Sequence, residues 1–287
     1  MGIDTVEGNW SRVLKLVIPY FIIVGVFQYI GLLMLGLQFD DLGKNLSSQH
    51  TLVIMLCNAA GTFLVVWLFR RYLDKATFAS LGFESFKIKD VYWGLLMGAV
   101  IMSFGYLILL KADQIRYMNI TFVFTEFLLN TFFLILVAFT EEVLMRGYIL
   151  ANLMGSMNKY RALAVSSFLF SMMHMGNADY GWFAALELFF AGLLLGLSYL
   201  YTRNLWFPVA LHFSWNFFQG AVFGFNVSGR HIYSIINHLR VRDNIWNGGA
   251  FGFEGSVLSL IFQLISIVII FFLFRKREPS QSADLQQ

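Results

Sequence analysis

Two adjacent glutamates and an arginine lie in an otherwise apolar stretch, VAFTEEVLMRGYIL at 137–150. Ionisable groups inside a bilayer cost roughly 2.5–3.5 kcal/mol each, so each should have a partner or a function. Glu142 and Arg146 are four residues apart, so in a helix they share a face and can pair. Glu141 points about 100° away, and no basic residue lies three or four positions from it. We therefore expect a structural ion pair from Glu142 and Arg146, and chemistry from Glu141.

Three more polar residues occur in apolar stretches further along the chain. His174 ends the run FLFSMMH, with Phe170 one turn before it, and His212 and Asn216 are four apart in LHFSWNF. A lone histidine in an apolar helix is more often a hydrogen-bonded core residue than a catalytic one. Two histidines, a facing asparagine and an unpaired glutamate together favour a polar site.

Such a site could carry out hydrolysis. A carboxylate and an imidazole can activate a water molecule, either directly as general bases or around a divalent metal. An imidazole and an amide on one helix face can donate to a developing oxyanion. Glu141, His174 and His212 would also suit zinc, although the HExxH signature is absent, so the residue types leave a metal such as zinc open.

The composition indicates a membrane protein. Of the 287 residues, 58% are hydrophobic and 13% are charged, and the mean hydropathy is +0.68, whereas a soluble domain has roughly 25% charged residues. The net charge of +3 is small and the basic residues are spread over loops, which argues against a nucleic-acid partner. Cys57 is the single cysteine, which excludes an intrachain disulfide.

The apolar segments predict an all-α polytopic membrane protein with about eight transmembrane helices and a polar chamber inside the bundle, since a span takes about 20 apolar residues. We expect a single transmembrane domain at 13–274, with a motif core at 137–220 and an outer loop at 226–255. A cytoplasmic N-terminus at 1–12 and a disordered cytoplasmic tail at 275–287 would flank it. The expected spans are 13–37, 51–69, 91–110, 122–150, 161–177, 181–202, 205–225 and 256–274.

Positive charge predicts the direction of the spans, because Lys and Arg accumulate on the cytoplasmic side. With the N-terminus inside, thirteen basic residues lie in inner segments and six in outer loops. Both termini of this cell-membrane protein should therefore be cytoplasmic. The six outer residues are Lys44, Lys111, Arg116, Arg230, Arg240 and Arg242.

Depth in the bilayer supports one shared site. At about 1.5 Å per residue from the cytoplasmic end of each expected span, Glu141 lies roughly 15 Å deep, His174 20 Å, His212 10 Å and Asn216 16 Å. Independent core residues would not need to share one layer. A convergent polar site within the membrane is the simpler interpretation.

The motifs, in order, are Glu141-Glu142-xxx-Arg146, Phe170-xxx-His174 and His212-xxx-Asn216. In this set the chain resembles the CPBP intramembrane proteases, the CAAX-prenyl-protease-like and bacteriocin-processing enzymes also called Abi. The segment NGGAFGFEGS resembles a loop of the bacterial members. The first motif alone is weakly specific, but all three in register are strongly specific.

The resemblance implies a role for each motif residue. Glu141 would be the catalytic carboxylate, working with His174 on the attacking water, and His212 and Asn216 would stabilise the oxyanion or complete a metal site. Glu142, Arg146 and Phe170 would support the site. It also implies a chamber open towards the cytosol, and leaves open whether a metal or glutamate alone activates the water.

The implied function is an intramembrane endopeptidase in contact with lipid and with a membrane-associated substrate, such as a prenylated tail, a leader peptide or a transmembrane protein. A non-catalytic scaffold or immunity protein of the same fold is the alternative, and a transporter or proton relay is a third. Glu187 could line the chamber or form a hydrogen bond across helices. Gly192 and Gly196 form GxxxG, which favours close helix packing.

Overall fold

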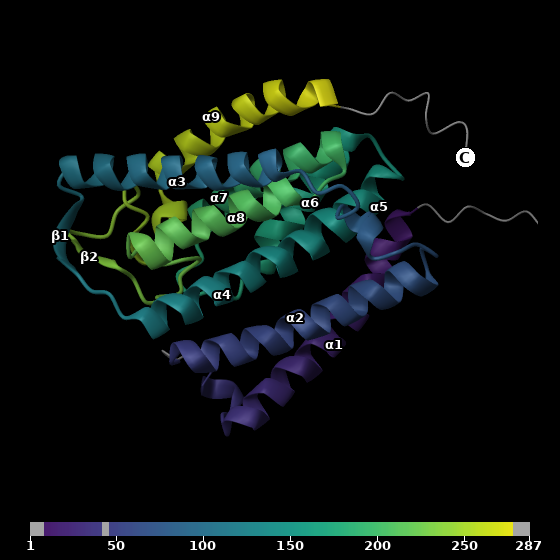
Figure 1. Ribbon diagram of the computed structural model, residues 1–287, viewed down its shortest axis with the longest axis horizontal. Helices are drawn as coiled ribbons and strands as arrows, with labels where there is room; N and C mark the ends of the chain where they lie inside the picture. Colours follow the sequence, from purple (N-terminus) through teal and green to yellow (C-terminus); the bar gives the residue numbers. More distant parts are fainter. Residues whose placement is uncertain (1–8, 42–45, 278–287) are drawn as a thin grey trace, which may run out of the picture.

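The computed structural model describes residues 9–41 and 46–277 (Figure 1). Most of the predicted N-terminal segment, Lys44 and residues 278–287 of the predicted tail lie outside this part. The main helices are α1 (Trp10–Leu35), α2 (Ser48–Tyr72), α3 (Ile88–Lys111), α4 (Phe124–Glu142), α5 (Ala151–Met154), α6 (Lys159–Met173), α7 (Trp182–Thr202), α8 (Trp206–Asn216) and α9 (Val257–Phe274).

The polytopic all-α fold class is confirmed, but the count of eight spans is too high. Six described helices are long and apolar enough to cross a bilayer: α1, α2, α3, the continuous Phe124–Met154 helix, α7 and the α9 helix. The expected spans 161–177 and 205–225 instead form the shorter helices α6 and α8. At about 1.5 Å per residue, the 15 residues of α6 reach roughly 22 Å, less than the hydrocarbon thickness of about 30 Å.

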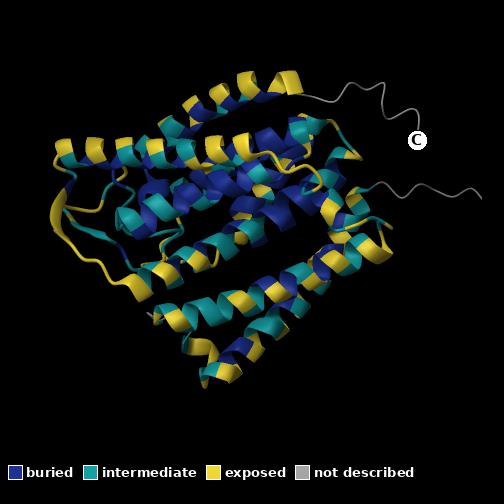
Figure 2. Ribbon diagram, viewed as in Figure 1, coloured by how far each residue is buried: buried dark blue, intermediate teal, exposed yellow. Residues whose placement is uncertain are grey.

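Successive helices run in opposite directions, so the described ends of the chain lie on one side of the molecule (Figure 1). The closest pairs are α1 with α2, α3 with α8, α6 with α7, and α7 with α9. Burial concentrates in the middle of the bundle, in α7, α8 and the second half of the α4 helix, while α1, α2, α3 and α9 present exposed faces (Figure 2). Glu141, His212 and Asn216 therefore lie on the most enclosed helices, while His174 follows α6.

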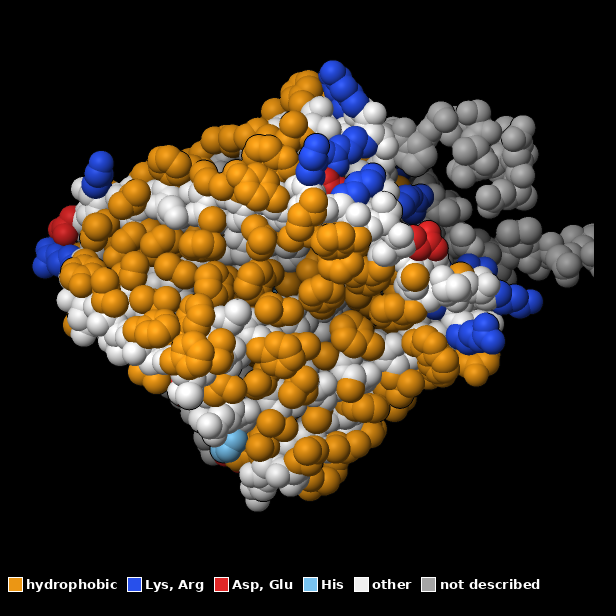
Figure 3. Space-filling model, in the orientation of Figure 1, with side chains coloured by type: hydrophobic (Ala, Val, Ile, Leu, Met, Phe, Trp, Pro, Cys, Tyr) orange, Lys and Arg blue, Asp and Glu red, His pale blue; other side chains and the backbone are white. Residues whose placement is uncertain are grey.

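The surface has the pattern of a bilayer-spanning protein. A broad band of hydrophobic side chains covers the visible face, and the Lys and Arg side chains gather mainly at the end where the chain termini lie (Figure 3). Lipid-facing side chains such as Ile18, Phe21 and Met34 of α1 are more than half exposed. This arrangement, together with the six long helices, supports a multi-pass membrane protein.

The segment expected to be an outer loop contains structure that the sequence patterns did not predict. Strand β2 (Ile236–Arg240) pairs antiparallel with β1 (Ile115–Ile120), which follows α3. Phe253 is fully buried, and its ring packs over Gly105 of α3, where a Cβ would overlap the ring. The loop is thus fixed to α3 at two places.

The C-terminal boundary also differs from the prediction. Arg275–Arg277 continue α9 as a short 3-10 turn, and the Arg277 guanidinium lies 2.5 Å from the Asp90 carboxylate at the start of α3. The predicted disordered tail, 275–287, therefore begins at least three residues too early.

Candidate active site

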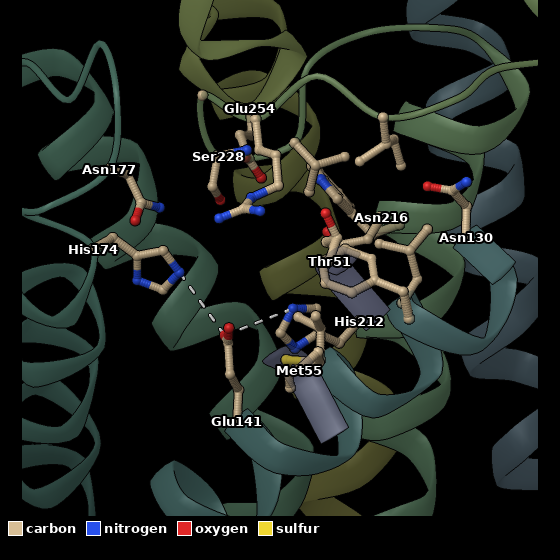
Figure 4. Close-up of a pocket in the computed structure, with 18 of the residues that line it drawn as sticks. Thr51, Met55, Asn130, Glu141, His174, Asn177, His212, Asn216, Ser228 and Glu254 are labelled. Atoms are coloured by element: carbon tan, nitrogen blue, oxygen red, sulfur yellow. Dashed lines mark hydrogen bonds and ion pairs between the residues drawn. The ribbon is translucent and has the colours of Figure 1, made fainter. Parts of the chain in front are cut away.

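Glu141, His174 and His212 converge from three helices on one point inside the bundle (Figure 4). The Glu141 Oε2 atom lies 3.8 Å from His174 Nε2 and 3.9 Å from His212 Nε2. These separations are too long for direct hydrogen bonds, but a water molecule about 2.8 Å from each atom would fit between them. The convergence that the sequence predicted for these three residues is therefore present.

Each of the three sequence motifs lies next to a change in helix geometry. The α4 helix changes to a π-helix at Val143–Leu150, directly after the two glutamates, and α8 changes to a π-helix at Phe217–Val222, directly after Asn216. Helix α6 ends at Met173, so His174 is its C-terminal cap rather than an interior residue. π-Helical turns are rare and occur often at functional sites. All three motifs thus lie where regular α-helix ends.

The hydrogen bond at Nδ1 defines the orientation of His174. Nδ1 lies 2.8 Å from the carbonyl oxygen of Phe170. A carbonyl oxygen only accepts, so Nδ1–H donates, and in the neutral ring the lone pair is on Nε2. That lone pair faces Glu141. The ring of Phe170 lies 4.8 Å from the His174 ring and supports it.

His212 is oriented by the second glutamate. Its Nδ1 atom lies 2.9 Å from Glu142 Oε1, and Arg146 lies 2.8 Å from the same oxygen. Arg146 also donates to the carbonyl oxygen of Gly192 at 3.2 Å and lies 4.5 Å above the Phe170 ring. Glu142 and Arg146 are almost completely inaccessible. The predicted ion pair is present, and it additionally orients the His212 imidazole.

Helix α6 packs closely on α7 at Gly192, the residue whose carbonyl oxygen Arg146 contacts. A Cβ at Gly192 would lie 2.7 Å from Cα of Ser167 on α6, so no larger residue fits at this spacing. This confirms the predicted packing role of Gly192. Gly192 therefore takes part in both contacts: it allows the close approach of α6, and its carbonyl oxygen accepts a hydrogen bond from Arg146 of the ion pair.

The three residues lie at the base of a cavity of about 950 Å³. Asn216, one turn after His212, lines it, as the sequence spacing indicated. The Glu141 side chain is 26% exposed into this space, against 12% for His174 and 8% for His212. The cavity is therefore a polar chamber in which a carboxylate can meet water.

Further polar residues, which the sequence patterns did not single out, line the chamber. Glu126 and Asn130 are four apart on α4, and the Ser48 hydroxyl donates to Glu126 at 2.5 Å and accepts from Asn130 at 2.9 Å. The same spacing rule that selected Glu142 and Arg146 would have found this pair. Arg230 and Glu254 also line the chamber, but they lie in the loop, where no periodicity exists to select them.

Glu254 is buried at the chamber wall, just before α9. The backbone N–H of Ser228 donates to its carboxylate. Burial raises the pKa of the Glu254 carboxyl above its ordinary value. A carboxyl with a raised pKa faces the same chamber as the two imidazoles.

Glu187 does not belong to the chamber. It is fully buried on α7, and Nε2 of Gln263 on α9 donates to its Oε2 at 2.8 Å. Of the two interpretations of Glu187, the structure supports a hydrogen bond across helices.

The predicted zinc ligands can be compared with metal geometry. Tetrahedral zinc with ligand distances of about 2.0–2.2 Å needs ligand atoms roughly 3.3–3.5 Å apart, closer than the 3.8 and 3.9 Å found here. Within the ranges 9–41 and 46–277, no group of three or more His, Cys, Asp or Glu side chains is placed to hold a metal ion. The ligand set Glu141, His174 and His212 stays a prediction.

Comparison with known protein families gives one match. The family described as type II CAAX prenyl endopeptidase Rce1-like matches residues 14–218, which include every motif residue. The chain belongs to the Rce1-like family. No curated protein matches the chain.

Membership in the Rce1-like family confirms the resemblance to the CAAX-protease-like group. It supports a CAAX-type intramembrane protease, a membrane-embedded enzyme that acts on a protein or peptide substrate. The match ends before Arg230 and Glu254, so these two loop residues that line the chamber lie outside it.

Proposed function

We propose that the chain is an intramembrane endopeptidase that hydrolyses a peptide bond in a membrane-associated or lipidated peptide or protein. The observation that carries the proposal is the position of Glu141 Oε2, which faces Nε2 of two imidazoles across the width of one water molecule. The surrounding chamber is large enough to admit a peptide segment.

In this mechanism the attacking water lies between Glu141 and His174. Glu141 accepts the proton of the water as it attacks the scissile carbonyl, and the Nε2 lone pair of His174 orients the second hydrogen. Glu141 then returns the proton to the leaving amine. The Nδ1–H bond from His174 to Phe170 keeps that imidazole in the required tautomer.

His212 and Asn216 act on the oxyanion of the tetrahedral intermediate. His212 does so as the imidazolium, with Nδ1–H donated to Glu142 and Nε2–H donated to the oxyanion. Asn216, one turn further along the same helix, supplies the amide donor. Glu142 and Arg146 position His212 and do not touch the substrate.

Terminal-peptide proteomics on membranes tests this function. Cells expressing the wild type, Glu141→Gln or Glu187→Gln are compared, since Glu187 is a fully buried acid that does not itself line the chamber. New peptide termini should appear with the wild type and Glu187→Gln and be absent with Glu141→Gln. A zinc chelator added to wild-type membranes should leave these termini unchanged, and their loss would favour the metal-bound alternative.

The non-catalytic alternative predicts a different result. If the three strains give identical termini while a cellular phenotype persists in Glu141→Gln, the endopeptidase proposal fails. The scaffold or immunity function then replaces it.

A further inference from the structure

The chamber extends to one end of the bundle, and the lining residues identify which end. They include Ser47 and Ser48 at the start of α2, Glu126 near the start of α4, and the loop residues 227–233. In the ribbon view these starts lie at the end of the molecule that carries β1 and β2, away from the chain termini (Figure 1). Figure 4 shows Ser228 and Glu254 of the loop across the chamber from Glu141.

The basic residues lie mainly at the opposite end. They occur at the starts of α1, α3 and α6, after the ends of α2 and α7, and at the end of α9. The thirteen are Arg12, Lys15, Arg70, Arg71, Lys75, Lys87, Lys89, Lys159, Arg161, Arg203, Arg275, Lys276 and Arg277. The chamber end has Lys111, Arg116, Arg230, Arg240 and Arg242 among the described residues.

This distribution gives the orientation in the membrane. Loops rich in Lys and Arg stay in the cytoplasm, and every connection here is short enough for the rule to apply. The end with thirteen basic residues is therefore cytoplasmic, and the chamber extends towards the other side. The sequence had suggested cytoplasmic termini and, through the resemblance, a chamber open to the cytosol. In this structure the two expectations are incompatible.

We propose that the chamber of this chain opens to the non-cytoplasmic side of the membrane. Its substrate is then a peptide segment that reaches the site from that side: a translocated segment or a chain anchored in the outer leaflet. The identity of the substrate rests on the proposed endopeptidase function, whereas the orientation of the mouth does not.

The single cysteine makes the orientation measurable. Cys57 is half-buried in α2, and Cys57→Ala gives a chain without thiols. Single cysteines are then introduced at three exposed positions: Ala178 at the chamber mouth, Ala112 at the same end after α3, and Ser85 at the opposite end before α3. Each is a small residue, so Ala178→Cys, Ala112→Cys and Ser85→Cys change little volume.

Intact cells are treated with a membrane-impermeant maleimide, with and without permeabilisation. We expect labelling of Ala178→Cys and Ala112→Cys in intact cells, and labelling of Ser85→Cys only after permeabilisation. The opposite pattern, or equal labelling of all three in intact cells, would overturn the proposed orientation.

The same labelling is repeated in the Glu141→Gln background to separate the two proposals. Labelling does not require catalysis, so the pattern should be unchanged even if no substrate is ever cleaved. An inverted pattern with Glu141-dependent cleavage would refute only the orientation. The expected pattern without any cleavage would refute only the endopeptidase.

Discussion

The structure buries two carboxylates in the middle of the bundle under opposite conditions. Glu141 on α4 is 26% exposed to a chamber of about 950 Å³ and faces two imidazoles without a direct hydrogen bond to either. Glu187 on α7 is fully buried, and its Oε2 accepts a hydrogen bond from Gln263. In sequence both are acids in apolar segments, although Glu141 has Glu142 beside it and Glu187 has no neighbouring acid.

In the proposed mechanism, this difference separates the catalytic carboxylate from the structural one. A base must keep a lone pair within reach of water and substrate, which requires space in front of it. A structural acid in the same apolar surroundings is closed off from water and accepts a hydrogen bond from a neighbouring side chain, as Glu187 Oε2 does from Gln263. Four predictions test this contrast.

Glu141→Gln should give the largest effect. The amide keeps the shape of the side chain but cannot accept the proton of the water, so we expect a loss of roughly 10²–10⁴-fold in the rate of peptide cleavage. Purified protein in lipid, assayed with a substrate found by terminal-peptide proteomics, provides the measurement. An unchanged melting temperature would confirm that the fold is intact, and an unchanged rate would refute the role of Glu141.

Arg146→Met should destabilise the fold most. Glu142 would lose the Arg146 guanidinium and keep only the contact with His212, and breaking a buried ion pair costs about 3–5 kcal/mol. Thermal unfolding in detergent measures the effect. The double variant Glu142→Met with Arg146→Met should be more stable than Arg146→Met alone, because it also removes the buried Glu142 carboxylate. A double variant that is less stable would show that the pair is not the dominant contribution.

Glu254→Gln should change how stability depends on pH. Burial raises the pKa of the Glu254 carboxyl, so the folded state holds this proton more tightly than the unfolded state. Its contribution to stability is full below the ordinary glutamate range near about 4.3 and is lost as the pH rises through the raised pKa.

Melting temperatures of the wild type and Glu254→Gln over that range measure this contribution. The glutamine oxygen can still accept from the Ser228 N–H, so the hydrogen bond is a constant in the comparison. The melting temperature of Glu254→Gln should rise relative to that of the wild type as the pH increases. Parallel curves would contradict the assignment.

Glu187→Gln should have the smallest effect. A glutamine at 187 can accept from Gln263 Nε2 and can also donate to Gln263 Oε1, a buried atom without a hydrogen-bond partner. Stability should change by less than about 1 kcal/mol and the cleavage rate should not change. Glu187→Leu, which leaves Gln263 unsatisfied, should cost about 1–3 kcal/mol. A loss of activity in Glu187→Gln would remove the contrast between the two carboxylates.

Local spacing predicted the parts of the site that depend on one helix. The four-residue interval gave the Glu142–Arg146 pair and placed Asn216 beside His212, and both are found. The contact between His212 and Glu142 joins residues 70 apart, and no interval in the sequence encodes it. The π-helical turns were missed because a helix that widens for one turn keeps the same apolar composition.

Span counting failed where apolar helices are too short to cross the bilayer. Helices α6 and α8 read as spans because they are apolar. Most hydrophobic residues of α8 are buried among other helices, whereas α6 exposes Val165 and Phe168 but has only 15 residues. The strand pair β1–β2 was missed because its two halves lie more than a hundred residues apart, at Ile115–Ile120 and Ile236–Arg240. Composition determines which segments avoid water, and tertiary contacts determine what covers them.

The seating of Phe253 over Gly105 has a mechanical consequence for the chamber. Lifting the loop away from α3 would pull this ring into water, at a cost of about 1.5–3 kcal/mol. At 1.4 kcal/mol per factor of ten, the ring alone would keep a lifted loop to between about one molecule in ten and one in a hundred. The neighbouring Glu254 is therefore held at the chamber wall in most molecules by the packing of Phe253.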